Sequence, residues 1–256
     1  MQDMTIPSLK GKKVLITGSS RGIGYAMAEG FAKNGCSVAI HGTRMTEKLA
    51  EAKRSLEALG AEAVIVCGDL SDPSAPQRIV TEAAEALGGL DVLVSNVSVQ
   101  IRKPWREITD EEMRLQTEVN FFSGIKLIQA AVPYMLNSGW GRIITVGSTQ
   151  QEKPHPDMLI YSANKSAMRN VVQSLAGQLA DKNITVNNLS VGTIHTDRNA
   201  EVLSDPKYYE KVKKDIPTGF IGQPNDCVGA ALLLASDAGR YITAENLHID
   251  GGKAFI

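Results

Sequence analysis

Short apolar segments rich in β-branched residues alternate with longer amphipathic segments along almost the whole chain. The short segments lie at 13–17, 37–42, 63–68, 90–95, 142–147, 184–190 and 246–249. They are apolar on both faces, which is typical of strands in a parallel sheet that helices cover on both sides. The longer segments predict helices near 23–34, 46–60, 73–88, 109–138, 158–181 and 225–236. This alternation predicts an α/β fold: a single doubly wound (Rossmann) domain with a mostly parallel seven-stranded sheet.

The chain of 256 residues is long enough for one large α/β domain. No repeat, low-complexity stretch or linker divides it, so we expect one domain over residues 1–256. The interval at about 192–223 separates the last two predicted strands, and we expect a small helical lid there. Two helix starts are marked: Asp72 before Pro73 predicts an N-cap and a first-turn proline, and Thr109 with Glu112 predicts a capping box.

Composition argues against several kinds of function. Hydrophobic residues make up 43% and charged residues 21%, and a net charge of -1 gives no reason to expect nucleic acid or a membrane surface as partner. No apolar run is long enough for a signal peptide or a membrane span, so we expect a cytoplasmic protein. The three cysteines and four histidines are scattered, so we expect neither disulfides nor a metal site.

A glycine-rich segment, TGSSRGIG at 17–24, follows the first predicted strand and opens the first predicted helix. Gly18, Gly22 and Gly24 allow a tight turn and a close approach of the backbone to a pyrophosphate. The start of the helix offers unpaired N–H groups and a positive dipole end to the phosphates. The segment therefore predicts a dinucleotide site.

The residues after the second predicted strand indicate which nicotinamide cofactor binds. An acidic residue usually stands there in proteins that bind NAD, but this chain has AIHGTRMTEK, with Thr43 and Arg44 at the strand end. Arg21 lies in the glycine-rich segment. Two guanidinium groups and no carboxylate suit a 2′-phosphate, so we expect NADP(H), with Ser20 and Thr43 as helpers. The alternative is that Arg21 and Arg44 are ordinary surface arginines.

The glycine-rich segment, the GST at 147–149 and the YSANK at 161–165 together resemble the short-chain dehydrogenase/reductase family, over essentially the whole chain. Tyr161 and Lys165 are four apart in a predicted helix and so share one face. The resemblance implies that Tyr161 is the general acid or base, that Lys165 lowers its pKa and holds the cofactor ribose, and that Ser148 orients the substrate oxygen. It also implies that Asn120 holds a water that links Lys165 to solvent.

The resemblance implies further contacts with the cofactor. Asp69 matches the residue that contacts the adenine, and Asn96 could brace the sheet. The remaining implied contacts are Ile23, Leu70, Gly192, Ile194 and Thr196. Two departures from the family pattern concern this site: Ser98 stands where the family has a glycine close to the ribose, and Val191 stands where it has a proline. A serine would be strained if position 98 needed a positive φ, so we expect the backbone to shift slightly there and cofactor binding to survive. We also expect a looser turn after position 191.

The substrate is less well determined. Polar residues in the expected pocket, Gln150, Arg102 and Arg198, favour a small polar hydroxy or keto compound such as a sugar acid or polyol, with an arginine near its carboxylate. The stretches VQIRKP and STQQE weakly resemble the gluconate 5-dehydrogenase branch. One alternative is a 3-oxoacyl-carrier-protein reductase; another is a non-catalytic NADP-binding sensor. The resemblance also implies a homo-oligomer, a tetramer or a dimer.

Overall fold

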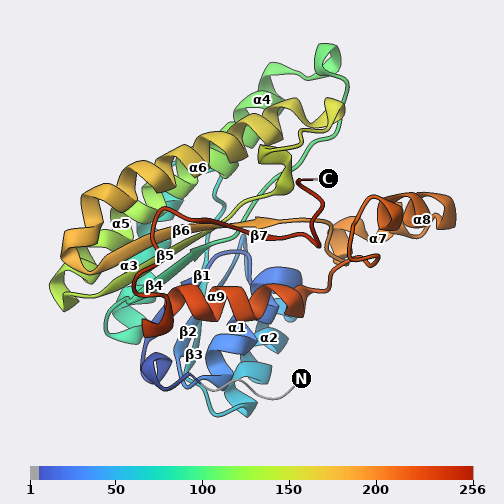
Figure 1. Ribbon diagram of the computed structural model, residues 1–256. Coiled ribbons are helices and arrows are strands. Elements are labelled where there is room, and N and C mark those ends of the chain that lie inside the picture. Colours follow the sequence, from blue (N-terminus) through green and yellow to red (C-terminus); the bar gives the residue numbers. More distant parts are fainter. Residues whose placement is uncertain (1–5, 256) are drawn as a thin grey trace.

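A sheet of seven parallel strands runs through the middle of the computed structural model, which describes residues 6–255 (Figure 1). The strands are β1 (Lys13–Ile16), β2 (Ser37–Gly42), β3 (Ala63–Cys67), β4 (Val92–Ser95), β5 (Gly141–Val146), β6 (Ile184–Val191) and β7 (Asn246–Ile249). Their order is β3-β2-β1-β4-β5-β6-β7, and every neighbouring pair is parallel. The predicted doubly wound sheet is confirmed.

Helices pack on both faces of this sheet. They are α1 (Gly22–Lys33), α2 (Glu47–Ala58), α3 (Ala75–Leu87), α4 (Asp110–Thr117), α5 (Ser123–Ser138), α6 (Leu159–Leu179), α7 (Asp197–Leu203), α8 (Pro206–Lys214) and α9 (Val228–Ala235). Helices α1, α2 and α9 cover one face, and α3, α5 and α6 cover the other (Figure 1). Among the described residues, no helix combines the length and the apolar character needed to span a bilayer.

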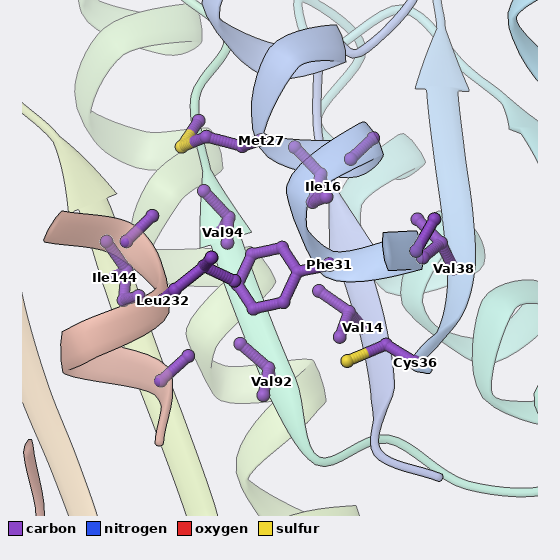
Figure 2. Close-up of a cluster of buried hydrophobic side chains, with 14 of the residues drawn as sticks. Val14, Ile16, Met27, Phe31, Cys36, Val38, Val92, Val94, Ile144 and Leu232 are labelled. Carbon is purple, nitrogen blue, oxygen red and sulfur yellow. The ribbon is translucent and has the colours of Figure 1, made fainter. Parts of the chain in front are cut away.

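Phe31 lies at the centre of the apolar cluster between the sheet and α1 (Figure 2). Its ring is fully buried, with Val14 of β1 and Val92 of β4 on the sheet side and Leu232 of α9 on the other side. Apolar side chains on both sides of α1 thus hold the helix that follows the glycine-rich segment. The cluster anchors the second half of α1 to the sheet.

The start of α3 differs from the sequence prediction. The helix begins at Ala75, and Pro76 is the proline in its first turn, whereas Pro73 lies before the helix. Asp72 does not cap α3: its Oδ1 accepts hydrogen bonds from Ser74 N at 2.9 Å and Ser74 Oγ at 2.8 Å. An Asx turn has therefore taken the place of the expected N-cap.

The long helix expected over 109–138 is interrupted. Its start is as predicted, because Thr109 and Glu112 form a capping box. After α4, residues Glu118–Phe122 form a π-helical segment, and α5 follows. Such widened turns occur frequently at functional sites. This one contains Asn120.

The interval after β6 contains α7 and α8, which stand away from the sheet (Figure 1). They enclose a small apolar cluster of their own, formed by Leu203, Val212, Ile216 and Ile221. A parallel bridge between Ile194 and Gly222 brings the two ends of the interval together. The interval is thus built as a separate small unit at the carboxyl end of β6.

We expect Phe31→Ala to lower the free energy of unfolding by about 3–5 kcal/mol, because it removes a fully buried ring and leaves a cavity. Urea unfolding followed by circular dichroism measures the change. Tyr241→Ala is the control, since this side chain is 99% exposed and its loss should change the value by less than about 0.5 kcal/mol. A loss below about 1 kcal/mol for Phe31→Ala would contradict the central role of this ring.

Candidate active site

A cleft of about 640 Å³ opens at the carboxyl ends of the central strands. Most of the residues predicted for the site line it: Gly18, Ser20, Arg21, Gly22, Ile23, Gly24, Thr43, Asn96, Arg102, Ser148, Gln150, Tyr161, Lys165, Gly192, Ile194, Thr196 and Arg198. Four predicted residues do not line it: Arg44, Asp69, Leu70 and Asn120. The cleft therefore unites the glycine-rich segment, the expected reacting residues and the expected substrate residues in one space.

The glycine-rich segment can hold nothing larger than glycine at two positions. Gly18 has a φ of +66°, and a Cβ there would lie 2.8 Å from Val97 Cγ2. A Cβ on Gly24 would lie 2.4 Å from Gly18 O. Helix α1 begins at Gly22, and no side chain caps its first N–H groups. The backbone here thus fits the close approach of an anion such as a pyrophosphate.

His41 braces this segment, and the sequence analysis did not identify it. Its Nδ1 accepts a hydrogen bond from Gly18 N at 3.1 Å, and its Nε2 donates to Gly68 O at 2.9 Å. Burial lowers the pKa of His41, which favours the neutral ring that these two bonds require. The only sequence signal is a polar residue near the end of an otherwise apolar strand.

Arg21 lies at the rim of the cleft. Its Nη1 contacts Asp197 Oδ2 at 2.9 Å, and Lys48 Nζ lies 3.5 Å from the same oxygen. The Arg21 and Asp197 side chains are 61% and 58% exposed, so water weakens the pair and a phosphate can replace the carboxylate. Thr43 lines the cleft beside Arg21, whereas Arg44 lies outside it.

Asp69, expected near the adenine, and Leu70, expected near the cofactor, serve the local structure. Asp69 Oδ1 accepts hydrogen bonds from Ser71 N at 2.9 Å and from Ser71 Oγ at 2.8 Å, which forms a turn. Leu70 is buried in the apolar cluster that contains α3. A contact of Asp69 with the adenine, and of Leu70 with the cofactor, stays a prediction.

Tyr161, Lys165 and Ser148 meet in the middle of the cleft. Helix α6 carries Tyr161 and Lys165, and Ser148 follows β5. Ser148 and Ser98 line the same cleft, and their hydroxyl groups lower the pKa of Tyr161. Lys165 Nζ donates to Val146 O at 2.7 Å and lies 5.7 Å from the centre of the Tyr161 ring. A reacting oxygen placed at Tyr161 would thus face several donors.

Burial shifts the pKa values of both α6 residues toward their neutral forms. It raises the pKa of Tyr161, and the Arg198 guanidinium and the hydrogen bonds from Ser148 and Ser98 act in the opposite direction. Burial and, to a smaller extent, the Arg198 guanidinium lower the pKa of Lys165 to about 7. The positive charge of Arg198 lowers the pKa of Tyr161, and the expected effect of Lys165 on that pKa stays a prediction.

Asn120 lies behind this group. Its Oδ1 accepts a hydrogen bond from Val99 N at 2.8 Å, and its Nδ2 donates to Val99 O at 2.7 Å. Both bonds hold the segment that follows β4, which includes Ser98. The water that Asn120 is expected to hold stays a prediction.

A second polar group lies farther along the cleft. Arg102 Nη2 lies 2.7 Å from His155 Nε2, and Arg102 Nη1 donates to Tyr208 Oη at 3.3 Å. Gln150 Oε1 accepts a hydrogen bond from His155 N at 2.6 Å. Lys253 also lines the cleft, and nothing in the sequence of the C-terminal segment marks it as a site residue. Burial lowers the pKa of His155, Arg102 lowers it as well, and Lys253 has a smaller effect in the same direction. Arg102 and Lys253 thus form a cationic wall.

Comparisons with known proteins show which proteins this chain is similar to. A family model described as enoyl-(acyl carrier protein) reductase matches residues 18–254. The chain is 37% identical to the glucose 1-dehydrogenase of Gluconobacter oxydans (strain 621H), over 94% of this chain and 91% of that protein. It is 32% identical to the gluconate 5-dehydrogenase of the same strain, over 96% and 95%.

The structure also resembles a crystal structure of a 3-oxoacyl (acyl-carrier-protein) reductase from Agrobacterium tumefaciens C58 with NADP bound. The TM-score is 0.91, the sequences are 37% identical, and the match covers 98% of each chain. The chain belongs to the short-chain dehydrogenase/reductase family. It is therefore an oxidoreductase that acts on CH–OH groups or the corresponding carbonyls.

The structure accommodates both departures of this short-chain dehydrogenase/reductase from the family pattern. Among the described residues, the non-glycine residues with a positive φ are Asn183 and Ala244, so Ser98 carries no such strain. Val191 is the last residue of β6 and pairs with Ile249 of β7. The backbone at Ser98 is therefore not left-handed, and the survival of cofactor binding and the looser turn after Val191 stay predictions.

We expect the stability of this short-chain dehydrogenase/reductase, without cofactor, to rise with pH between about 7 and 10 because of Lys165. Its pKa is about 7 in the folded protein and near 10.5 when unfolded, so the unfolded chain binds more protons in this window. The rise should approach about 1 kcal/mol per pH unit. Urea unfolding at pH 7.5, 8.5 and 9.5 measures it.

Lys165→Met should remove most of this rise, whereas Lys213→Met, a change of an exposed side chain on α8, should keep it. Lys253, whose pKa burial also lowers, stays in both variants and contributes equally. Equal slopes for wild type and Lys165→Met would contradict a lowered pKa of Lys165.

Proposed function

We propose that the protein is an NADP(H)-dependent enzyme that interconverts a secondary alcohol and a carbonyl in a small polar substrate that bears a carboxylate, such as a sugar acid. The observation that carries the proposal is the group formed by Tyr161, Ser148 and Lys165 in the same cleft as the glycine-rich segment. The cationic wall of Arg102 and Lys253 supports the choice of substrate.

The residues of the cleft fit NADP(H). The glycine-rich segment, which lines the cleft, and the uncapped start of α1 suit the pyrophosphate, and Arg21 and Thr43 suit the 2′-phosphate. Lys165 would hold the nicotinamide ribose. NADP is present in the Agrobacterium reductase that this chain resembles, which supports the same cofactor here. When bound, the cofactor supplies the oxidised or reduced nicotinamide that accepts or gives the hydride.

Tyr161 acts as the proton donor or acceptor of the reaction. In the reductive direction its hydroxyl gives a proton to the oxygen of the substrate carbonyl, and in the oxidative direction its phenolate takes the proton of the alcohol. Ser148 lies beside the Tyr161 hydroxyl and would hold the same substrate oxygen. The buried setting keeps water away from this oxygen, because Tyr161 and Lys165 are each 6% exposed.

The cationic wall favours an acidic substrate. Arg102 and Lys253 lie around His155 and Tyr208, which also line the cleft. A carboxylate binds guanidinium and ammonium groups through charge-assisted hydrogen bonds. The similarity to a gluconate 5-dehydrogenase supports a sugar acid. Arg198, the other arginine considered as a partner of the carboxylate, lies at the end of the cleft that contains Tyr161, Ser148 and Lys165, here called the reaction end.

A second candidate function is the reduction of a 3-oxoacyl thioester. The names of the family model and of the Agrobacterium reductase favour it. The lysines of α8, which could receive an acidic carrier protein, are mixed with acidic residues, as in the contact of Lys213 with Glu210 at 4.0 Å. This mixture favours the sugar-acid substrate. The homo-oligomer and the cytoplasmic location remain predictions from the sequence.

The test of the proposed function is a carbonyl panel with NADPH and, separately, NADH. The panel contains keto-sugar acids, neutral ketoses, simple aldehydes and an acetoacetyl thioester, and the loss of absorbance of the reduced cofactor is followed. We expect turnover with NADPH and a keto-sugar acid that falls by about 10²–10⁴-fold in Tyr161→Phe. Tyr25→Phe, outside the cleft, is the control. Turnover that survives in Tyr161→Phe would contradict the proposal.

We expect Arg102→Gln to raise KM for the acidic substrate by about tenfold or more and to leave KM for a neutral ketose unchanged. The expectation follows from the loss of one charge-assisted hydrogen bond, worth about 1.5–3 kcal/mol. Initial rates over a range of substrate concentrations give both values. Arg106→Gln, four residues along and outside the cleft, is the control. An equal change in KM for acidic and neutral substrates would contradict a carboxylate site at Arg102.

A further inference from the structure

Three separate segments supply the polar side chains around Arg102. Arg102 follows β4, His155 follows β5, and Tyr208 lies on α8 in the interval after β6, and all three line the cleft. Arg102 joins them, because its Nη2 lies 2.7 Å from His155 Nε2 and its Nη1 donates to Tyr208 Oη at 3.3 Å. These side chains therefore form one group inside the cleft, although they come from parts of the chain about 50 to 100 residues apart.

The ring of His155 lies between two hydrogen-bond donors. Its Nδ1 accepts from Asp157 N at 3.1 Å and so caps the short helical turn Pro156–Met158, while its Nε2 faces the Arg102 guanidinium. A neutral imidazole has one nitrogen that accepts and one that carries a proton, and a guanidinium group never accepts. Both contacts therefore cannot be hydrogen bonds at the same time, and a protonated ring could make neither of them.

The cap decides which nitrogen of His155 carries the proton. When Nδ1 accepts from Asp157 N, the proton of the neutral ring is on Nε2. Burial lowers the pKa of His155, which favours this neutral ring. The Nε2–H group and the Nη2 group of Arg102 are then two donors that face each other at 2.7 Å. Such a pair needs an acceptor that both donors can share.

Tyr208 adds a third donor. Its Oη accepts from Arg102, so its own proton is left for another acceptor. The Asp157 carboxylate does not fill this role, because its Oδ2 lies 3.8 Å from Arg102 Nε and 3.9 Å from His155 Nδ1, beyond hydrogen-bond length, and outside the cleft. A ligand carboxylate has two oxygens that only accept, and it carries the charge that suits a guanidinium group.

We propose that His155 and Tyr208 are substrate-binding residues that hold the carboxylate of the substrate together with Arg102, and so determine the preference for an acidic compound. One carboxylate oxygen separates the two facing donors and accepts from Arg102 Nη2 and His155 Nε2. The second oxygen accepts from Tyr208 Oη. The inference rests on the proposed function, because it needs an acidic substrate. Since Tyr208 lies on α8, the carboxylate also joins the interval after β6 to the segments that follow β4 and β5.

The test is the binding of gluconate and of glucitol to the protein loaded with NADPH, measured by isothermal titration calorimetry. Glucitol has a CH₂OH group where gluconate has the carboxylate, so the comparison isolates this one group. NADPH cannot accept a hydride, and neither alcohol is therefore consumed during the measurement. We expect the wild type to bind gluconate at least about tenfold more tightly than glucitol.

Two variants remove one donor each. Tyr208→Phe removes only the hydroxyl group, and His155→Asn removes the nitrogen that faces Arg102 but keeps an acceptor for the cap. Each change should weaken the binding of gluconate by about tenfold, as expected for one hydrogen bond to a charged group. The affinity for glucitol should change by less than about twofold.

Matched variants outside the cleft are the controls. Tyr209 packs against the same apolar cluster of α7 and α8 as Tyr208, but it does not line the cleft. His195 is exposed and also lies outside the cleft. Tyr209→Phe and His195→Asn should leave the affinities for gluconate and glucitol at the wild-type values.

The protonation of the His155 ring gives a second measurement. In the complex with NADPH and gluconate, the ¹⁵N shifts of protein labelled at histidine should show a proton on Nε2 of His155, because this nitrogen donates to the carboxylate. The spectrum of His155→Asn identifies the signals of this ring. An Nε2 without a proton in the complex would overturn the role of His155.

Wild-type affinity for gluconate in both Tyr208→Phe and His155→Asn, or equal losses for gluconate and glucitol, would overturn the inference. Gluconate binding that still depends on Arg102 would in that case leave the proposed function standing. A wild type that binds the two compounds equally would overturn the inference together with the acidic substrate, whereas turnover that depends on Tyr161 would keep the alcohol–carbonyl chemistry. Thermal melting shows whether each variant is folded. If His155→Asn does not fold, Tyr208→Phe and the ¹⁵N shifts carry the test.

Discussion

Thr17 and Asn96 join the carboxyl ends of β1 and β4, the neighbouring strands between which the order of the sheet reverses. Asn96 Nδ2 donates to Thr17 O at 2.9 Å, and Asn96 N donates to Thr17 Oγ1 at 2.9 Å. From Thr17 the chain continues into the glycine-rich segment, and from Asn96 it continues to Ser98. One set of hydrogen bonds thus positions the start of the cofactor site and the start of the reaction end. In open parallel sheets the ligand crevice lies at this switch point.

The reaction end is governed by the cost of burying charge. Burial favours the neutral forms of both Tyr161 and Lys165, whereas the proposed oxidation of an alcohol needs the phenol of Tyr161 to ionise. Fixed donors and a permanent charge reduce this cost without any rearrangement during the reaction. Ser148, Ser98 and Arg198 are such groups, because other parts of the chain already hold them in place. The cleft therefore combines exclusion of water with a preorganised set of donors.

Local patterns explain which predictions held. Thr109 and Glu112 form the expected capping box because both partners lie within one helical turn. The central strands could be predicted because burial on both faces of the sheet favours a short apolar segment. The start of α3 was misplaced because Asp72 can bond to Ser74 in a turn as well as cap a helix. The π-helical turn at Asn120 has no local pattern, since its side chain is held by Val99, 21 residues away.

The sequence by itself determined the doubly wound sheet, the glycine-rich turn and the pairing of Tyr161 with Lys165. Each of these depends on residues that are close in the chain, or on a periodicity that burial imposes. Only the tertiary structure decided that His41 holds Gly18, that Lys253 lines the cleft and that Arg198 holds Ser98. These contacts join segments about 20 to 150 residues apart, and their geometry depends on how loops leave the sheet. No local spacing encodes such a contact, because it is set by packing of the whole domain.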